Sequence, residues 1–289
     1  MRETKIKFTS VVSLIVGMLF TMFTLGASSA SAFFYSSDGW NTNDLNSTII
    51  QGDKNITDRT YEVYPFSEIE VSGSLQVSVS SDYSNDIQVK TDDNIQDHII
   101  VKVESGILKL KIKGSIAPTQ PVQIKVPYYF GLLSKVNANS SSRVSFETDV
   151  EAENFYAICS SSSTITFNSI KVNNDVLLYA ASYGSIIMNN LDALNTIKAT
   201  CNSLGVLHVL NPGQADSAIL KASSNGKIKM DVIDFNTVNA EGSSSSYISF
   251  TANKVITIKS ISFAEIEYKG ESKQNDITKY SFGKVRKIG

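Results

Sequence analysis

Three consecutive lines of 21 residues decide the fold: STITFNSIKVNNDVLLYAASY (163–183), GSIIMNNLDALNTIKATCNSL (184–204) and GVLHVLNPGQADSAILKASSN (205–225). Each line has a pair of apolar residues two positions apart near its start, and a second such pair eleven positions later. A small residue follows the second pair in every line, as Ala180, Cys201 and Ala222. Several positions recurring in phase at such a period are typical of a solenoid, in which each repeat packs on its neighbours.

The repeat extends from Ser134 to Tyr268. The first apolar pair recurs as Val144/Phe146, Ile165/Phe167, Ile186/Met188, Leu207/Val209, Ile228/Met230, Ile248/Phe250 and Ile266/Tyr268. The second recurs as Phe155/Ala157, Val176/Leu178, Ile197/Ala199, Ala218/Leu220, Val238/Ala240 and Ile256/Ile258. Apolar residues at i and i+2 indicate strands, and no stretch has the sustained stripe of an amphipathic helix. The sequence therefore predicts an all-β parallel β-helix with coils of about 18–21 residues, each a short strand, a turn, a second short strand and a polar corner.

Two further columns describe the bends. The turn before each first pair has Ser142, Ser163, Gly184, Gly205, Gly226 and Ser246 in phase. We expect positive φ at the glycines, and serine hydroxyls that bond neighbouring backbone groups. Another corner has Glu153, Asn174, Asn195 and Asp216 in phase, which favours side-chain ladders between coils. Tyr183 and Leu204 are also in phase and are expected at exposed turn tips.

The two cysteines test this register. Export would favour a disulfide between Cys159 and Cys201. They lie 42 residues apart in one column, however, with Ala180 between them. Two coils span about 9.6 Å, beyond the roughly 7 Å across which Cα atoms can be bridged. We therefore predict two unbridged thiols that act as small core residues.

Residues 1–32 have the pattern of an export signal. Arg2, Lys5 and Lys7 precede an apolar run at 11–25, and the residues at 30–32, Ala-Ser-Ala, fit a small-x-small cleavage site. We expect a mature chain that begins at Phe33 and is periplasmic, surface-exposed or secreted. An uncleaved anchor helix is the alternative, because the apolar run is long. No second apolar run is long enough to span a bilayer.

The exported part divides into a lead-in and one β-helix domain. The expected ranges are 33–60 for the lead-in, 61–130 for irregular N-terminal coils, 131–270 for regular repeats and 271–289 for a C-terminal tail or partial coil, so that the β-helix domain covers 61–289. The lead-in contains the single Trp40. Pro121 and Pro127 bracket one strand, which predicts an edge strand or a bend. A separate small β-domain is the alternative for 61–130, and Phe282 or Val285 is expected to pack inward in the tail.

The charge balance gives no sign of nucleic-acid binding. Residues 1–32 contain three basic and one acidic residue, so the remaining chain has 23 basic and 27 acidic residues and a net charge of −4. A polyanion-binding surface of that kind would need an excess of lysine and arginine. The arginines of this part, Arg59, Arg143 and Arg286, are too scattered in sequence to predict a clamp for phosphate or carboxylate.

The sequence shows no constellation typical of catalysis or metal binding. Polysaccharide-cleaving β-helices need carboxylates from adjacent coils in one column, and Asp149, Asp192, Asp231 and Asp234 do not align that way. His98 and His208 are isolated, and strand alternation points His208 outward. The serine runs at 140–142, 160–163 and 243–246 coincide with turns. We predict no catalytic, cofactor-binding or metal-binding residue.

Four motifs then suggest a family. FSEIEVSG (66–73), DDNI (92–95), SGILKLKI (105–112) and YKG (268–270) occur in this order. Together they resemble the putative auto-transporter adhesin, head GIN domain family, over roughly residues 50–289. This chain has serine, alanine or asparagine at turns where that family prefers glycine. The resemblance implies a right-handed β-helix on exported bacterial proteins, without a catalytic motif from which residue roles can be transferred.

The leading hypothesis is a non-enzymatic, exported β-helical module for binding or adhesion, with glycans or cell-envelope components as partners. A long rigid face suits repeated weak contacts, and no site constellation points to an enzyme. The alternatives are a polysaccharide-active β-helix enzyme and a structural or assembly protein of the envelope. The sequence does not assign a ligand or an oligomeric state.

Overall fold

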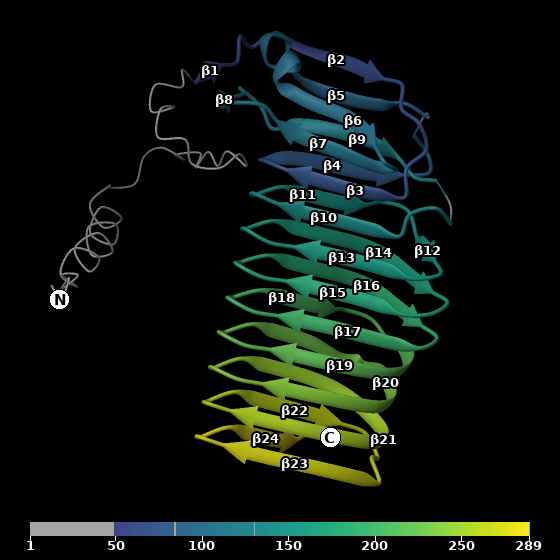
Figure 1. Ribbon diagram of the computed structural model, residues 1–289, viewed down its shortest axis with the longest axis vertical. Coiled ribbons are helices and arrows are strands. Elements are labelled where there is room, and N and C mark those ends of the chain that lie inside the picture. The colour runs from purple at the N-terminus through teal and green to yellow at the C-terminus, as the bar shows by residue number, and fades with distance from the viewer. Residues whose placement is uncertain (1–48, 84, 130, 289) are drawn as a thin grey trace, which may run out of the picture. The chain divides into compact units, whose positions relative to one another are not determined.

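A computed structural model describes residues 49–83, 85–129 and 131–288, which form a β-solenoid of about seven turns (Figure 1). Strands account for 64% and helix for 3% of the structure, which confirms the predicted all-β class. The predicted export signal at 1–32, its anchor-helix alternative and Trp40 lie outside the described residues.

The regular coils consist of parallel strands that pair with strands of the neighbouring coils. In chain order they are β10 (Lys135–Asn139), β11 (Arg143–Phe146), β12 (Val150–Ala152), β13 (Phe155–Cys159), β14 (Thr164–Val172), β15 (Val176–Ala180), β16 (Ser185–Ala193), β17 (Thr196–Cys201), β18 (Val206–Val209), β19 (Gly213–Ala222), β20 (Lys227–Gly242), β21 (Tyr247–Ile261), β22 (Glu265–Lys269), β23 (Gln274–Tyr280) and β24 (Lys284–Lys287).

Each regular coil has three sides, whereas the sequence predicted two strands. We name the side with the first apolar pairs sheet I (β11 and the start of β14) and the side with the second pairs sheet II (β13, β15, β17). Between them lies a short sheet III, in which β12 pairs with the end of β14. Its buried residues Val150, Ile170 and Leu191 follow polar positions that obscure the strand in the sequence.

Equivalent residues of neighbouring coils lie beside one another, as the period predicts. Ile165 pairs in register with Val144 on one side and with Ile186 on the other, and all three are fully buried or nearly so. The ring of Phe167 stacks on that of Phe146 from the previous coil, with centroids 4.6 Å apart and planes 19° apart. Phe155 meets Phe167 edge-on at 5.6 Å. The core is therefore a set of in-phase columns.

The small column contains both cysteines, as predicted. Ala180 pairs in register with Cys159 and with Cys201, and both thiols are buried and free. Burial raises the pKa of Cys159 to about 11 and the pKa of Cys201 further still. Two protonated thiols separated by a coil act as small apolar groups.

The turns from sheet II to sheet I correct one prediction. Positive φ occurs not at Gly184 and its equivalents but at the two residues before them, such as Ser161 (φ 53°) and Ser162 (φ 62°). Two consecutive positive φ values, with Ser163 N donating to Ser160 O at 3.2 Å, are typical of a type I′ turn. Glycine is needed at 184 for space, because a Cβ atom there would lie 2.2 Å from the carbonyl oxygen of Cys159.

The serines of this column also differ from expectation. The hydroxyl of Ser142 donates to the hydroxyl of Ser163 in the next coil at 3.3 Å, whereas we expected a backbone partner. The predicted corner ladder is present: Asn174 donates to Glu153, and Asn195 donates to Asn174, each at 3.4 Å. Side-chain hydrogen bonds thus link equivalent residues of neighbouring coils, in the same register as the backbone pairing.

The N-terminal region does not continue the stack in sequence order. Its elements are β1 (Ile50–Gln51), β2 (Ile56–Tyr61), β3 (Glu68–Ser72), β4 (Leu75–Ser80), β5 (Ile87–Asp92), the 3₁₀ helix η1 (Asp93–His98), β6 (Ile99–Glu104), β7 (Ile107–Ile112), β8 (Ile116–Ala117) and β9 (Val122–Pro127). The β3–β4 coil lies next to the first regular coil, and the later β7–β9 coil stacks on its other side. β2, β5 and β6 then add antiparallel strands at the end of the solenoid (Figure 1).

Of the two alternatives predicted for the strand between Pro121 and Pro127, an edge or a bend, the edge is wrong. β9 has β4 on one side and β5 on the other. Proline is tolerated here because Pro121 precedes the strand and Pro127 is its last residue, so no amide is missing from the middle of the ladder. The true edges at this end are β2 and β6, which pair on one side each.

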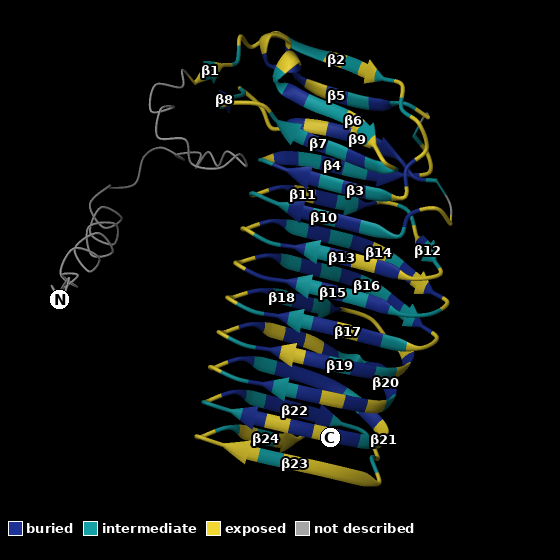
Figure 2. Ribbon diagram, in the orientation of Figure 1, coloured by how far each residue is buried: buried dark blue, intermediate teal, exposed yellow. Residues whose placement is uncertain are grey.

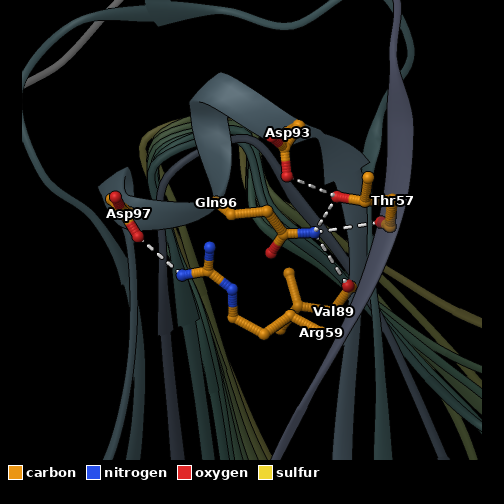
Figure 3. A network of polar contacts seen from close by, with 6 residues as sticks. All are labelled: Thr57, Arg59, Val89, Asp93, Gln96 and Asp97. Atoms are coloured by element: carbon orange, nitrogen blue, oxygen red, sulfur yellow. Dashed lines mark hydrogen bonds and ion pairs between the residues drawn. The ribbon is translucent and has the colours of Figure 1, made fainter.

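Polar contacts hold η1 against β2 and β5 (Figure 3). The buried Gln96 amide donates to the carbonyl oxygens of Thr57 (2.9 Å) and Val89 (3.2 Å). On the surface, the guanidinium of Arg59 binds Asp97 at 2.6 Å. The helix therefore closes the end of the core, and a covered end avoids recruiting other strands.

The polar tail forms the last coil. β23 pairs with β21, and β24 pairs with β22. Of the two residues expected to pack inward, Val285 contacts the core, whereas Phe282 is 77% exposed at a turn. The hydrophobic core runs from Phe66 to Tyr268 as one cluster.

Candidate functional site

A hollow of about 590 Å³ lies on the outer face of sheet I near the N-terminal end. We call it the basic hollow and define it by Lys90, Lys125 and Arg143 with the polar residues around them. These are Gln76, Gln88, Gln123, Ser78, Ser145, Thr164, Thr166 and one carboxylate, Asp58. Their strands, β2, β5, β9, β4, β11 and β14, are far apart in sequence and adjacent in the sheet.

The strand register arranges these side chains in two rows across the sheet. The first row runs Asp58, Lys90, Gln123, Gln76, Arg143 and Thr164. The second row runs Gln88, Lys125, Ser78, Ser145 and Thr166. Alternate residues of each strand face the core, so every residue of both rows points to the same outer face. Neighbouring members of a row are about 4.8 Å apart, close enough to contact one small ligand together.

The hollow carries uncompensated positive charge. None of Lys90, Lys125 and Arg143 forms an ion pair with another described residue, although most ion pairs of the solenoid involve lysine. The only carboxylate among the lining residues is Asp58. Three exposed cations against one carboxylate favour an anionic group in the hollow.

Tyr83 lies beside the hollow. Its hydroxyl is 3.0 Å from Ser78 Oγ and 2.9 Å from Glu147 Oε2, and the ammonium of Lys125 is 5.5 Å from its ring centroid. Burial raises the pKa of Tyr83, and the Glu147 carboxylate raises it further, so the phenol stays protonated at neutral pH. Contact with the ring therefore limits the positions that the flexible Lys125 side chain adopts, so less side-chain entropy is lost when its ammonium binds a ligand.

Sequence reasoning missed this cluster. The arginines are indeed scattered, but Arg143 is joined by two lysines from β5 and β9, which the out-of-order N-terminal topology brings next to it. The available signal was the alternation of polar residues, Gln88/Lys90 and Gln123/Lys125, on strands that would face solvent. The order of the strands could not be read from it.

The four aspartates considered for catalysis remain apart, but one of them lies near a glutamate that the sequence analysis did not consider. Asp231 and Glu267 both approach Ser249: its hydroxyl donates to Asp231 at 3.2 Å, and Glu267 is its register partner. Lys269 binds Asp231 at 2.8 Å, and Arg286 binds Glu267. Burial alone would raise the pKa of Asp231, but Lys269 brings it below the ordinary value, and Arg286 lowers the pKa of Glu267. A general acid needs a raised pKa, so this pair lacks a property that glycoside hydrolysis uses.

The other residues considered for catalysis or metal binding are not brought together into a site. Asp149 accepts a hydrogen bond from Asn168 at 2.7 Å, and Asp192 accepts one from the backbone of Gln214 at 3.0 Å. Asp234 pairs in register with Gln214. His208 lies on the outer face between buried Leu207 and Val209, as predicted. Among the residues that the structure describes, no group of three or more His, Cys, Asp or Glu side chains is arranged to hold a metal ion.

A rigid solenoid with a polar, positively charged hollow on one sheet is a scaffold of the kind that presents a binding surface. The chain belongs to the family described as putative auto-transporter adhesin, head GIN domain, whose sequence profile matches residues 65–272. This confirms the family that the four sequence motifs suggested.

Solved structures share the fold. A putative adhesin from Parabacteroides merdae superimposes with a TM-score of 0.71 at 15% identity, covering 83% of this chain and 99% of its own. A putative lipid binding protein from Parabacteroides distasonis gives 0.68 at 21% identity, covering 84% and 100%. A putative adhesin from Bacteroides fragilis gives 0.58 at 18% identity, covering 83% and 100%. Identities this low establish the fold alone.

No curated protein sequence matches the chain. Within the described ranges, no helix has both the length and the apolar character needed to cross a bilayer.

Proposed function

We propose that this protein is an exported, non-enzymatic binding module of the adhesin type, and that the basic hollow holds an anionic group of a glycan or another cell-envelope polymer. The observation that carries the proposal is the convergence of Lys90, Lys125 and Arg143 on one outer face without ion-pair partners among the described residues. The family and the export pattern of residues 1–32 support the extracytoplasmic setting.

The lining suits a hydroxylated, acidic ligand. Three glutamine amides offer both donors and acceptors for sugar hydroxyls, and Ser78, Ser145, Thr164 and Thr166 add hydroxyl groups. Arg143 has a planar fork of donors that fits carboxylate or phosphate, and the lysines act as point charges. A volume of about 590 Å³ is in the range of pockets for small ligands or for one or two units of a polymer.

The single carboxylate of the hollow favours binding over turnover. Hydrolysis of a glycosidic bond uses a pair of carboxyl groups, and Asp58 is the only carboxylate among the residues that line the hollow. A solenoid whose outer face is fixed by continuous pairing is preorganised, so little conformational entropy opposes weak contact with a polymer. Repetition of such contacts on a cell surface adds avidity.

The test is a binding screen of the mature chain, from Phe33 onward, against acidic and neutral glycans and purified envelope polymers. The decisive variant replaces Lys90, Lys125 and Arg143 together by glutamine. The matched control replaces Lys171, Lys221 and Lys254, which are exposed on other faces, by glutamine as well, so that both variants lose the same net charge.

We expect binding to an acidic polymer that weakens by about fivefold to tenfold for each cation removed from the hollow and falls as salt rises. The control triple variant should bind like the parent. Equal losses in both triple variants would mean that only net charge matters, and an empty screen with folded protein would remove the proposal.

A further inference from the structure

Two exposed phenylalanines lie side by side on the edge of the solenoid formed by the type I′ turns. Phe263 belongs to the turn between β21 and β22, and Phe282 to the turn between β23 and β24. Their rings stack with centroids 5.1 Å apart and planes 12° apart, although the residues are 63% and 77% exposed. Figure 2 shows this edge as a line of exposed turn tips, one above another, with the two turns at its C-terminal end.

The turn itself does not need phenylalanine. The same position in four other coils contains small polar residues, Ser141, Ser162, Asn225 and Ser245, and in two coils it contains Tyr183 and Leu204, which are exposed as the sequence predicted; all have positive φ. Phe263 and Phe282 adopt the same backbone conformation, with φ of 65° and 68°, which is unfavourable for bulky side chains. Two large apolar groups are therefore placed in solvent, at some cost in backbone energy, at a position where small polar residues suffice in four other coils. Stacking of the two rings offsets part of that cost but leaves both side chains exposed to solvent.

Two lysines flank the turn of Phe282: Lys284 lies beside its register partner Glu265, and Lys279 follows the core-facing column at the C-terminal end of the stack. Lys279 and Lys284 are exposed within three residues of Phe282, and neither forms an ion pair with another described residue. Tyr280, in the same turn, is 56% exposed and offers an amphipathic ring. Aromatic side chains flanked by lysines are the combination that sits at the boundary between the headgroups and acyl chains of a bilayer.

We propose that this end of the turn edge binds the surface of an anionic lipid bilayer, with Phe263 and Phe282 inserted at the headgroup level and Lys279 and Lys284 facing the phosphates. A second copy of the chain fits less well. Two phenyl rings cover far less than the roughly 800 Å² that each partner contributes to a stable interface. The lysines of one copy would also face those of the other in a symmetric pair. This site is separate from the basic hollow, so each can fail independently.

The experiment is co-sedimentation of the mature chain with vesicles of phosphatidylcholine containing about 30 mol% phosphatidylglycerol, compared with phosphatidylcholine alone. The test variant combines Phe263→Asn and Phe282→Asn, because asparagine already occupies this turn position at Asn225 and tolerates positive φ. The matched control is Leu194→Asn, which removes a 65% exposed apolar side chain from a different bend.

We expect binding to the anionic vesicles, a loss of at least about tenfold in the double variant, and about fivefold for each of Lys279→Gln and Lys284→Gln. Leu194→Asn should leave binding unchanged. In a Trp40→Phe background, Phe282→Trp should show fluorescence quenched by brominated lipid. Each of three results would overturn the proposal: equal binding to neutral and anionic vesicles, an unaffected double variant, or a tryptophan that brominated lipid does not quench. Binding of the Phe282 region to a protein instead of to vesicles would overturn it as well.

Discussion

The stacked pair Phe146/Phe167 allows a direct measurement of how strongly neighbouring coils are coupled. Both residues are almost fully buried, at 4% and 3% exposure, and belong to adjacent coils. Replacing either by leucine keeps an apolar side chain and removes the ring. Each favourable ring contact contributes about 0.5–1.5 kcal/mol beyond its buried area. Phe167 makes two such contacts, with Phe146 and Phe155, so Phe167→Leu should lower the free energy of unfolding by about 1–3 kcal/mol.

The coupling follows from a double-mutant cycle. If the rings stack as described, the effects of Phe146→Leu and Phe167→Leu should differ from additivity by about 0.5–1.5 kcal/mol, because both variants remove the same contact. The measurement is urea unfolding followed by circular dichroism, with the slope compared between variants to confirm that the transition is the same. Phe146→Leu combined with Phe250→Leu is the control, since these residues lie several coils apart and should add within about 0.3–0.5 kcal/mol.

Two results would refute the reasoning. Additivity within experimental error for the adjacent pair would mean that the rings do not touch and that the register of the coils is wrong. An equally large coupling for the distant pair would mean that the solenoid does not behave as a chain of nearest-neighbour contacts.

Three further predictions concern the buried groups and the period. Burial alone would raise the pKa of Asp92, but hydrogen bonds from Thr119 and from the Lys54 amide bring the pKa below its ordinary value. The stability that the Asp92 carboxylate provides is therefore present at neutral pH and is lost as the pH falls through that lowered pKa. Asp92→Asn should lower the free energy of unfolding by about 1–3 kcal/mol at pH 7, and urea unfolding should show a smaller difference between variant and parent in acid. Cys159 and Cys201 should react with a thiol reagent only after unfolding, and the intact mass should not be lower by the two hydrogens that a disulfide would remove. Deleting 184–204, one full coil, should leave a folded protein with an unchanged strand signal. Deleting 184–194 should prevent folding, because the following strand then moves out of phase and His208 takes the buried place of Ile197.

The regular stack was predictable because its information is local and repeated. A wrong register assigned at one coil would conflict with the pattern of the next coil. The pairing of Ile165 with Ile186 follows from the same step of 21 residues as that of Ile186 with Leu207. The same logic excluded a disulfide between Cys159 and Cys201 without any knowledge of the coordinates. In-phase polar residues likewise predicted the ladder at Asn174 and Asn195.

Features that depend on single positions were not predictable in the same way. The type I′ geometry moved positive φ from Gly184 to the two residues before it, and the role of that glycine is the close approach of Cys159 O, a contact between coils. The third strand of each coil was hidden because only Ile170 and Val172 face inward there, and two buried residues do not establish a period. The order of strands at the N-terminal end depends on β5 and β6 running antiparallel, which no pattern within one strand specifies.

This difference bears on where a binding site can arise in a solenoid. In the regular coils, each outward row continues through equivalent positions, so a row gathers side chains of similar environment, and a charge can be paired along it, as Lys259 is with Glu241. A site with a particular set of groups requires that the period be broken. The chain breaks it where β5 and β9 insert between β2 and β4, and the lysines of those two strands reach the same face as Arg143 only because of that insertion. The regular coils then serve as the rigid support, and the irregular end supplies the chemistry.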